Sequence, residues 1–289
     1  MAAVSKNVRL IVVALVFCLC GTPKAVPYDA RRVISLIPAT TEMLFAMGAG
    51  DRVVAVSSYD HFPPEVERLP RVGALIDPDV ERILTLRPDL VIVYGTQLEL
   101  KAKLERAQIP FYSYTHKGLA DVVETMRLLG ARVGVEAQAN ALAARIETEL
   151  AAVRARVANR PRPKTLLLFG REPGSLRGLD ASGGQGFLHD MLEVAGGIDV
   201  LADQRRQSVM MSTEMVLARA PDVIVELRYA RRDTTETDDI RAWDALPAVP
   251  AVRNRRVVVL RGEEFVVPGP RVALATERLA RALHPEAFE

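Results

Sequence analysis

Residues 81–93 read ERILTLRPDLVIV, and residues 214–226 read EMVLARAPDVIVE. When Glu81 is aligned with Glu214, a leucine, a Pro-Asp pair and an apolar run coincide in the two copies. Each copy has the pattern of a short helix that ends before its proline and leads into a buried strand. The repetition therefore predicts two similar halves, each containing one such helix and strand.

Further strand patterns alternate with helical patterns on both sides of the two copies. They lie at 33–36, 52–57, 90–94 and 109–114 in the first half, and at 165–169, 223–227 and 256–260 in the second. Helical patterns stand between or after them, for example at 187–194 and 276–283. This alternation favours a parallel sheet in each half.

A long helix is predicted between the two halves. Residues 136–157 are rich in Ala, Glu, Arg and Leu, and apolar residues recur there every three or four positions. The segment Arg160-Pro161-Arg162-Pro163 ends this pattern. The predicted fold class is thus α/β, with two Rossmann-like lobes joined by one long backbone helix. We expect an N-terminal lobe at 26–134, the linking helix at 135–160 and a C-terminal lobe at 161–289.

The first 25 residues have the pattern of a secretory signal peptide. Lys6 and Arg9 precede an apolar run at 10–20, and small residues including Ala25 follow it. The apolar run is too short to span a bilayer comfortably. We therefore expect a signal peptide at 1–25 and a mature protein that begins near Val26.

Both cysteines of the chain lie inside this segment. The mature protein would then have no thiol, which excludes disulfides, thiolate metal sites and a cysteine nucleophile. A lipoprotein signal needs a small residue before its cysteine, whereas Phe17 and Leu19 precede Cys18 and Cys20. Lipid anchoring is therefore disfavoured.

Composition limits the classes of partner. The chain has 289 residues, of which 49% are hydrophobic, and a formal net charge of only +2. This is ordinary for a soluble protein of one or two domains. Because the charge is nearly balanced and no strong basic block occurs, a nucleic-acid partner is not predicted. We expect a monomer.

Four segments carry a resemblance to a known family. They are RRVISLIPATTEMLFAMGAGDRVVAVSSYDHFPPEV at 31–66, LPRVG at 69–73, FLHDMLEVAGG at 187–197 and STEMVLARAPDVIV at 212–225. Together with 81–93, their order resembles that of the periplasmic substrate-binding proteins of iron-chelate and cobalamin ABC importers, the helical-backbone or class III type. The resemblance implies a periplasmic binder, not an enzyme, that captures a cobalamin-type or iron-chelate ligand between its lobes. It would deliver that ligand to the membrane permease of an ABC transporter, and the transported ligand would be its only bound group.

The resemblance also implies a role for the repeated glutamate. In this family one exposed glutamate on each lobe docks an arginine of the permease, and the matching residues here are Glu81 and Glu214. The alternative is a helix-stabilising role. Asp79 and Ser212 stand two residues earlier as candidate N-caps, so each glutamate falls in a first helical turn, where a carboxylate interacts favourably with the helix dipole.

The cleft is predicted at the carboxyl ends of the strands, where open α/β sheets bind ligands. The side chains that follow strands are Tyr59, His61, Tyr94, Tyr114 and His116 in the first half, and Phe169, Arg171, Arg228, Tyr229, Glu263 and Phe265 in the second. From these the predicted ligand contacts are Tyr59, Tyr94, Phe169, Arg171, Arg228 and Glu263.

Three ligand classes stay open. The resemblance favours cobalamin at Tyr59, within SSYDHFPP, and at Tyr94, but Leu75 and Ser208 stand where cobalamin binders often have tryptophan. A ferric siderophore would use guanidinium groups, for which the candidates are Arg171, Arg177 and Arg228. Haem would need an axial ligand, for which Tyr59 or His61 is the candidate.

Two other classes of function have less support in the sequence. A metal site would need His61, His116 and His189 to converge, and no histidine-rich loop supports one. A secreted enzyme is the alternative of a different class. The glycine-rich segment GLDASGGQG at 178–186 matches neither a phosphate-binding loop nor a nucleophile elbow, and it is expected to be a loop. No metal ligands and no catalytic residues are predicted.

Overall fold

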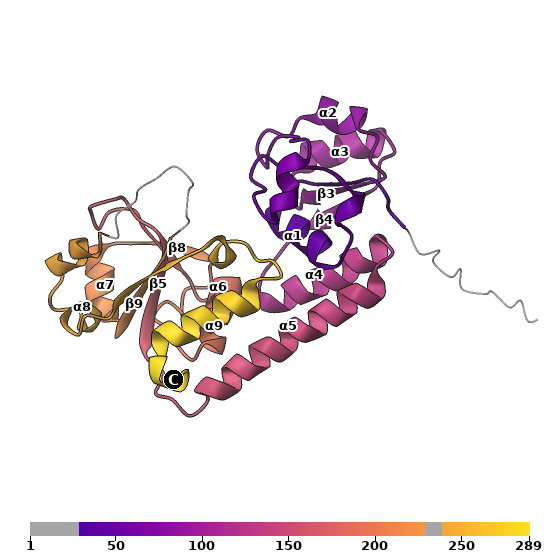
Figure 1. Ribbon diagram of the computed structural model, residues 1–289. Helices are drawn as coiled ribbons and strands as arrows, with labels where there is room; N and C mark the ends of the chain where they lie inside the picture. Colours follow the sequence, from indigo (N-terminus) through magenta and orange to yellow (C-terminus); the bar gives the residue numbers. More distant parts are fainter. Residues whose placement is uncertain (1–28, 229–238) are drawn as a thin grey trace, which may run out of the picture.

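The computed structural model describes residues 29–228 and 239–289. Two lobes stand side by side above a layer of helices (Figure 1). The predicted signal peptide with its cysteines, and the candidate contact Tyr229, lie outside the described residues. Within the part of the chain that is described, no helix is both long enough and apolar enough to cross a membrane.

The N-terminal lobe is built on a four-stranded parallel sheet in the order β2-β1-β3-β4. Its strands are β1 (Val33–Ser35), β2 (Val53–Val56), β3 (Leu90–Tyr94) and β4 (Phe111–Tyr114). Its helices are α1 (Pro38–Ala46), α2 (Val80–Thr85), α3 (Leu98–Arg106) and α4 (Leu119–Arg132), with short 3-10 turns η1 (Gly50–Arg52) and η2 (Pro64–Arg68). All four predicted strands are present.

The C-terminal lobe contains a mixed sheet in the order β10-β9-β5-β6-β8. Its strands are β5 (Lys164–Gly170), β6 (Leu179–Ser182), β7 (Ile198–Asp199), β8 (Ser208–Met211), β9 (Val223–Arg228) and β10 (Val257–Arg261). Its helices are α6 (Phe187–Val194), α7 (Thr213–Arg219), α8 (Pro250–Arg253) and α9 (Val272–Leu283), with 3-10 turns η3 (Ile240–Ala245), η4 (Glu263–Phe265) and η5 (Pro285–Ala287).

The expectation of a purely parallel second sheet, with a loop over 178–186, is wrong. Strands β6 and β8 extend the sheet in the antiparallel direction. Leu179 and Ala181 point into the core and are fully buried, and this alternation was hidden by the surrounding glycines.

The predicted linking helix is present as α5 (Glu136–Val157). Helix α4 of the first lobe and helix α9 of the second both pack against it, so the lobes rest on a three-helix layer rather than on one helix (Figure 1). Leu142, Ile146 and Val153 of α5 belong to a continuous apolar core that includes Met43 of the first lobe and Leu279 of the second.

The sequence repeat is also a repeat of local structure. Asp79 and Ser212 are the N-caps of α2 and α7, and each side chain accepts a hydrogen bond from the backbone amide three residues on, at 2.9 Å and 3.3 Å. Just after the two helices, Arg87 and Ala220 both adopt the left-handed conformation, with φ of 46° and 45°. The two helices therefore begin and end in the same way.

The strands that follow α2 and α7 also occupy equivalent positions in their two sheets. Asp89 accepts hydrogen bonds from the backbone amides that lead into β1, and Asp222 accepts one from the first amide of β5. Strand β3 pairs in parallel with β1, and β9 pairs in parallel with β5. Each copy thus fixes one surface helix to the centre of its own sheet.

Candidate ligand cleft and docking helices

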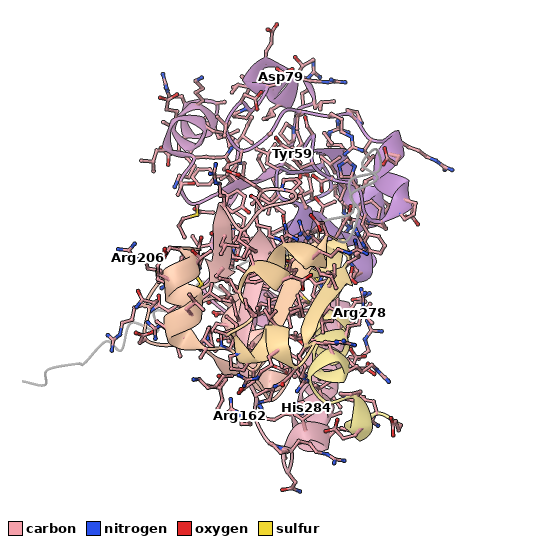
Figure 2. All side chains as sticks on the ribbon, turned by 90° about the vertical axis from the view of Figure 1, so that its left-hand side faces the viewer. Tyr59, Asp79, Arg162, Arg206, Arg278 and His284 are labelled. Atoms are coloured by element: carbon pink, nitrogen blue, oxygen red, sulfur yellow. The ribbon has the colours of Figure 1, made fainter. Side chains whose placement is uncertain are left out.

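The N-terminal lobe contributes aromatic side chains to the predicted cleft, and these side chains form the cleft's wall on this lobe. Tyr59 follows β2 and its residue surface is 66% exposed, whereas Tyr94, at the end of β3, is half-buried. Burial raises the pKa of the Tyr94 hydroxyl, which therefore stays protonated near neutral pH. Tyr59 lies inward from Asp79, which caps α2 at the far end of the lobe (Figure 2). Tyr59 offers the more accessible ring to a ligand.

A chain of rings runs from this wall to the C-terminal lobe. The Tyr94 and Tyr114 centroids are 5.7 Å apart, those of Tyr114 and His116 are 5.6 Å apart, and His116 meets Phe187 edge to face at 5.9 Å. Phe187 begins α6, so the last contact crosses between the lobes. Tyr114 is itself fully buried and supports its neighbours rather than lining a surface.

Hydrogen bonds join the lobes at the same place. The Gln207 side-chain amide donates to the His116 carbonyl at 3.2 Å, and the Asp190 carboxylate accepts from the Leu119 amide at 2.9 Å. Leu119 is the first residue of α4, so a side chain from the second lobe caps a helix of the first. Burial lowers the pKa of His116, which favours its neutral form in this setting.

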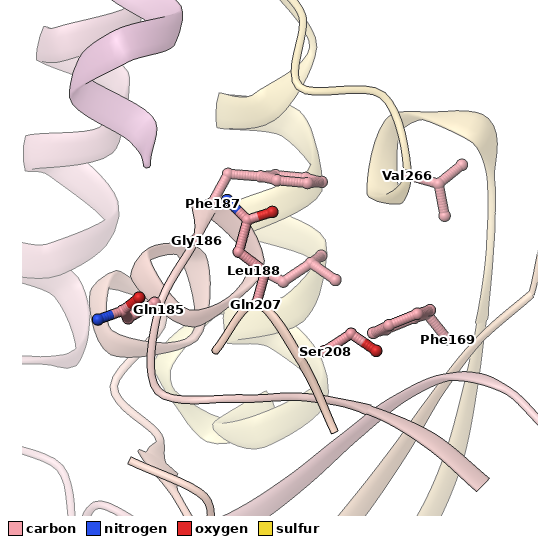
Figure 3. Close-up of a pocket in the computed structure, with 8 residues that line it drawn as sticks. All are labelled: Phe169, Gln185, Gly186, Phe187, Leu188, Gln207, Ser208 and Val266. Atoms are coloured by element: carbon pink, nitrogen blue, oxygen red, sulfur yellow. The ribbon is translucent and has the colours of Figure 1, made fainter. Parts of the chain in front are cut away.

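A pocket opens beside Phe187 in the C-terminal lobe (Figure 3). Its lining residues are Phe169, Gln185, Gly186, Phe187, Leu188, Gln207, Ser208 and Val266. Most of this lining is apolar, and Gln185, Gln207 and Ser208 supply polar groups. The predicted contact Phe169 lies in this pocket. Phe265, a further candidate, is fully buried in the core instead.

Arg171, which follows β5, and Arg228, at the end of β9, lie together. Both bind Glu226: Arg171 Nε is 2.7 Å from Glu226 Oε1, and Arg228 Nη2 is 2.5 Å from Oε2. The indole of Trp243 also donates to Glu226 Oε1 at 2.7 Å. The Arg171 side chain is only 2% exposed, so this geometry favours a structural role, and its contact with a ligand stays a prediction.

Sequence reasoning missed Glu226. Its signal was a single carboxylate inside the apolar run of β9, where a buried charge requires paired donors. Burial by itself raises its pKa, but the hydrogen bonds from Arg171 and Trp243 and the charges of Arg171 and Arg228 outweigh this and leave the pKa below the ordinary value. Glu226 therefore remains ionised as the centre of a buried cluster.

Glu226 should make the fold sensitive to acid. Because its pKa is lower in the folded than in the unfolded chain, its stabilising effect is complete above the ordinary value of 4.5 and is lost as pH falls through the folded-state pKa. We expect Glu226→Gln to be less stable than wild type at pH 7, with the difference shrinking below pH 4.5. Urea unfolding at a series of pH values measures this. A constant difference down to the lowest pH would contradict it.

An ion pair joins the two lobes directly. Arg271, which precedes α9, binds Glu42 of α1 through two hydrogen bonds of 2.9 Å and 2.6 Å. Its guanidinium also lies 4.1 Å from the ring centroid of Phe62. The predicted contact Glu263 lies 3.7 Å from Arg271 and keeps a quarter of its side chain exposed. Burial raises the pKa of Glu42, and Arg271 opposes that rise only in part.

The two repeated glutamates are on outer helices. Helices α2 and α7 lie on the sides of their lobes that face away from α5 (Figure 1). Glu81 and Glu214 are exposed in the first turns of these helices, and neither carboxylate forms an ion pair with another described residue. A hydrogen bond with the Ser212 side chain, followed by one with its own backbone amide, holds the pKa of Glu214 below its ordinary value.

The three histidines considered for a metal site have separate neighbours. His61 lies 3.9 Å from Glu67, His189 Nδ1 lies 2.8 Å from Asp199, and His116 belongs to the chain of rings. No group of three or more possible metal ligands is found in residues 29–228 and 239–289.

Comparison with known proteins gives consistent matches over most of the chain. A family model described as a periplasmic binding protein matches residues 33–264. A vitamin B12-binding protein of Yersinia pestis is 30% identical over 257 residues, covering 88% of this chain and 86% of the relative. The periplasmic haem-binding protein RhuT from Roseiflexus sp. RS-1 has a TM-score of 0.74 and 28% identity, covering 90% of this chain and 100% of that chain. The vitamin B12-binding protein BtuF of Vibrio cholerae has a TM-score of 0.76 and 27% identity, and the match covers 91% of this chain and 100% of that chain.

Proposed function

This chain belongs to the periplasmic binding protein family, and we propose that it captures a cobalamin-type ligand between its lobes for an ABC importer. The observation that carries the proposal is the set of aromatic and apolar side chains on both lobes: Tyr59 and Tyr94 on the first, and the pocket at Phe169 on the second. Large, flat chelates bind such surfaces through stacking and burial of apolar area. The relatives named for vitamin B12 support the same ligand class.

Haem is the second candidate. Two observations favour it: a relative of similar fold is named for haem, and Tyr59 and His61 lie two positions apart with accessible side chains. A ferric siderophore is less favoured, because Arg171 and Arg228 already bind Glu226. Binding of cyanocobalamin, haemin and a ferric hydroxamate can be compared by absorption difference spectra with the purified protein. Tight binding of haemin or the hydroxamate without binding of cyanocobalamin would reject the first candidate.

Removal of the accessible tyrosine should weaken binding. We expect Tyr59→Ala to raise the Kd for cyanocobalamin about fivefold, because stacking on one ring contributes about 1 kcal/mol. Tyr112→Ala is the matched control, since that ring lies on β4 beneath Arg132 and outside the proposed cleft. Isothermal titration gives both affinities, and thermal unfolding checks the fold. Unchanged affinity in both Tyr59→Ala and Tyr94→Ala would mean that the cleft is misplaced.

The proposed partner is the membrane permease of the importer. Glu81 and Glu214 would each bind an arginine of the permease through bidentate hydrogen bonds, and two such contacts on separate lobes would fix the orientation of the complex. Export would use the N-terminal segment 1–25 as a signal peptide, without lipid attachment at Cys18 or Cys20. We propose no enzymatic activity.

A further inference from the structure

Each outer helix exposes a leucine three residues after its glutamate. Leu84 on α2 is 39% exposed and Leu217 on α7 is 42% exposed, whereas the residues just before them, Ile83 and Val216, are fully buried. Other large apolar residues are also exposed, such as Leu128 and Leu274. What separates Leu84 and Leu217 from these is that they occupy the same position in the two structural copies and have nearly the same exposure.

The two helices share only this pair of residues on their exposed surface. Residues three apart on a helix are neighbours on one face, so each lobe presents a carboxylate beside an apolar side chain. The other exposed positions of α2, at Arg82 and Thr85, correspond to Met215 and Ala218 on α7. The shape and chemistry common to the two surfaces are therefore one glutamate and one leucine.

The physical chemistry of ion pairs explains why a leucine is needed there. An ion pair exposed to water contributes only about 0–1 kcal/mol, which is too little for firm docking. An apolar side chain that seals the edge of the contact excludes water and strengthens the pair inside it. The same arrangement on two lobes fits a partner that presents two equal sites.

We propose that Leu84 and Leu217 are the apolar anchors of the permease-docking surface. Each leucine enters an apolar recess next to the basic side chain that binds Glu81 or Glu214, one site on each of two identical membrane subunits. This inference rests on the proposed docking role of the two glutamates. It adds the residues that exclude water from those contacts, and it predicts an apolar recess beside each docking cation of the permease.

The test uses the leucine pair with a matched control. The variants are Leu84→Ser/Leu217→Ser and, as control, Leu128→Ser/Leu274→Ser, whose leucines are 46% and 51% exposed on α4 and α9. The probe is the permease of the source organism that binds the wild-type protein, purified in nanodiscs. We expect the first pair to weaken binding at least tenfold with unchanged ligand affinity and melting temperature, and the control pair to bind within twofold of wild type. The weaker permease binding of Leu84→Ser/Leu217→Ser should persist at high salt, whereas salt would screen a purely electrostatic effect.

The outcomes separate this inference from the function on which it rests. If Glu81→Ala/Glu214→Ala loses binding while the leucine pair binds normally, docking occurs through charge alone and the inference is wrong. If both pairs of variants bind normally, the proposed docking surface itself is wrong. Sedimentation of the wild type as a dimer that Leu84→Ser/Leu217→Ser dissociates would assign this surface to a second copy of the chain and overturn the proposal.

Discussion

Reversal of the two charges proposed for docking, in Glu81→Arg/Glu214→Arg, should weaken binding to the permease more than a hundredfold and stop transport. The reason is that each site would change from an attractive pair to two facing cations, and like charges in contact at an interface cost several kcal/mol. Ligand affinity should stay unchanged, because both glutamates are exposed on α2 and α7, and neither helix contributes a residue to the proposed ligand contacts. Surface plasmon resonance with the permease in nanodiscs and an uptake assay in cells measure the two effects.

Two other glutamates serve as matched controls. Glu99 and Glu136 occupy the first turns of α3 and α5, so they have the same relation to a helix dipole as Glu81 and Glu214. Reversal of charge at any of the four positions should cost at most about 1 kcal/mol of stability. The docking role would be rejected if the control variant, Glu99→Arg/Glu136→Arg, weakened permease binding as much as Glu81→Arg/Glu214→Arg does. The repeated glutamate would then only stabilise its helix.

The largest loss of stability is expected from Arg271→Met. This change leaves the carboxylate of Glu42, with only 3% of its side chain exposed, without the guanidinium that holds it. Removal of one member of a buried ion pair costs about 3–5 kcal/mol. Since Glu42 belongs to one lobe and Arg271 to the other, the loss should also loosen their relative orientation. Urea unfolding gives the stability, and distances between spin labels on the two lobes report their orientation.

Two changes should restore the stability that Arg271→Met loses: a lower pH and a second substitution at Glu42. Without Arg271, the raised pKa of Glu42 should rise further, so protonation removes the buried charge and the deficit should shrink as pH falls from 8 to 5. The double variant Glu42→Met/Arg271→Met should recover most of the stability, since apolar replacement of a buried pair is often neutral. A double variant as unstable as Arg271→Met would show that Arg271 acts mainly through its contacts with Phe62, Glu263 and Glu264.

Local patterns were sufficient to predict much of the fold. The proline that ends α2 and α7, the N-caps before them and the apolar strands after them are all signals that lie within about a dozen residues, and they led to two lobes and a long helix. Strands β6 and β8 were missed because their alternation is short and lies among glycines. An antiparallel pair of this length has little sequence signal without its neighbours.

The contacts between lobes could not be predicted from the sequence. Glu42 and Arg271 are 229 residues apart in the chain, and no sequence pattern connects them. Arg171 and Arg228 show the opposite case, because their position beside the end of the sheet was predicted but their partner was not. Glu226 points from the same strand as Arg228, and only the folded geometry shows that it accepts from both guanidinium groups.

Trp243 gives the protein an intrinsic optical reporter. It is the only tryptophan of the chain, its ring is 1% exposed, and its indole N–H is fixed on Glu226. Emission from such an indole should be shifted to the blue in the folded protein and should move to the red when the cluster around Glu226 opens. Cobalamin and haem both absorb in the near ultraviolet, where tryptophan emits, so either ligand held in the cleft would quench this single emitter by energy transfer. Binding and unfolding can therefore be followed on the unlabelled chain through one fluorophore.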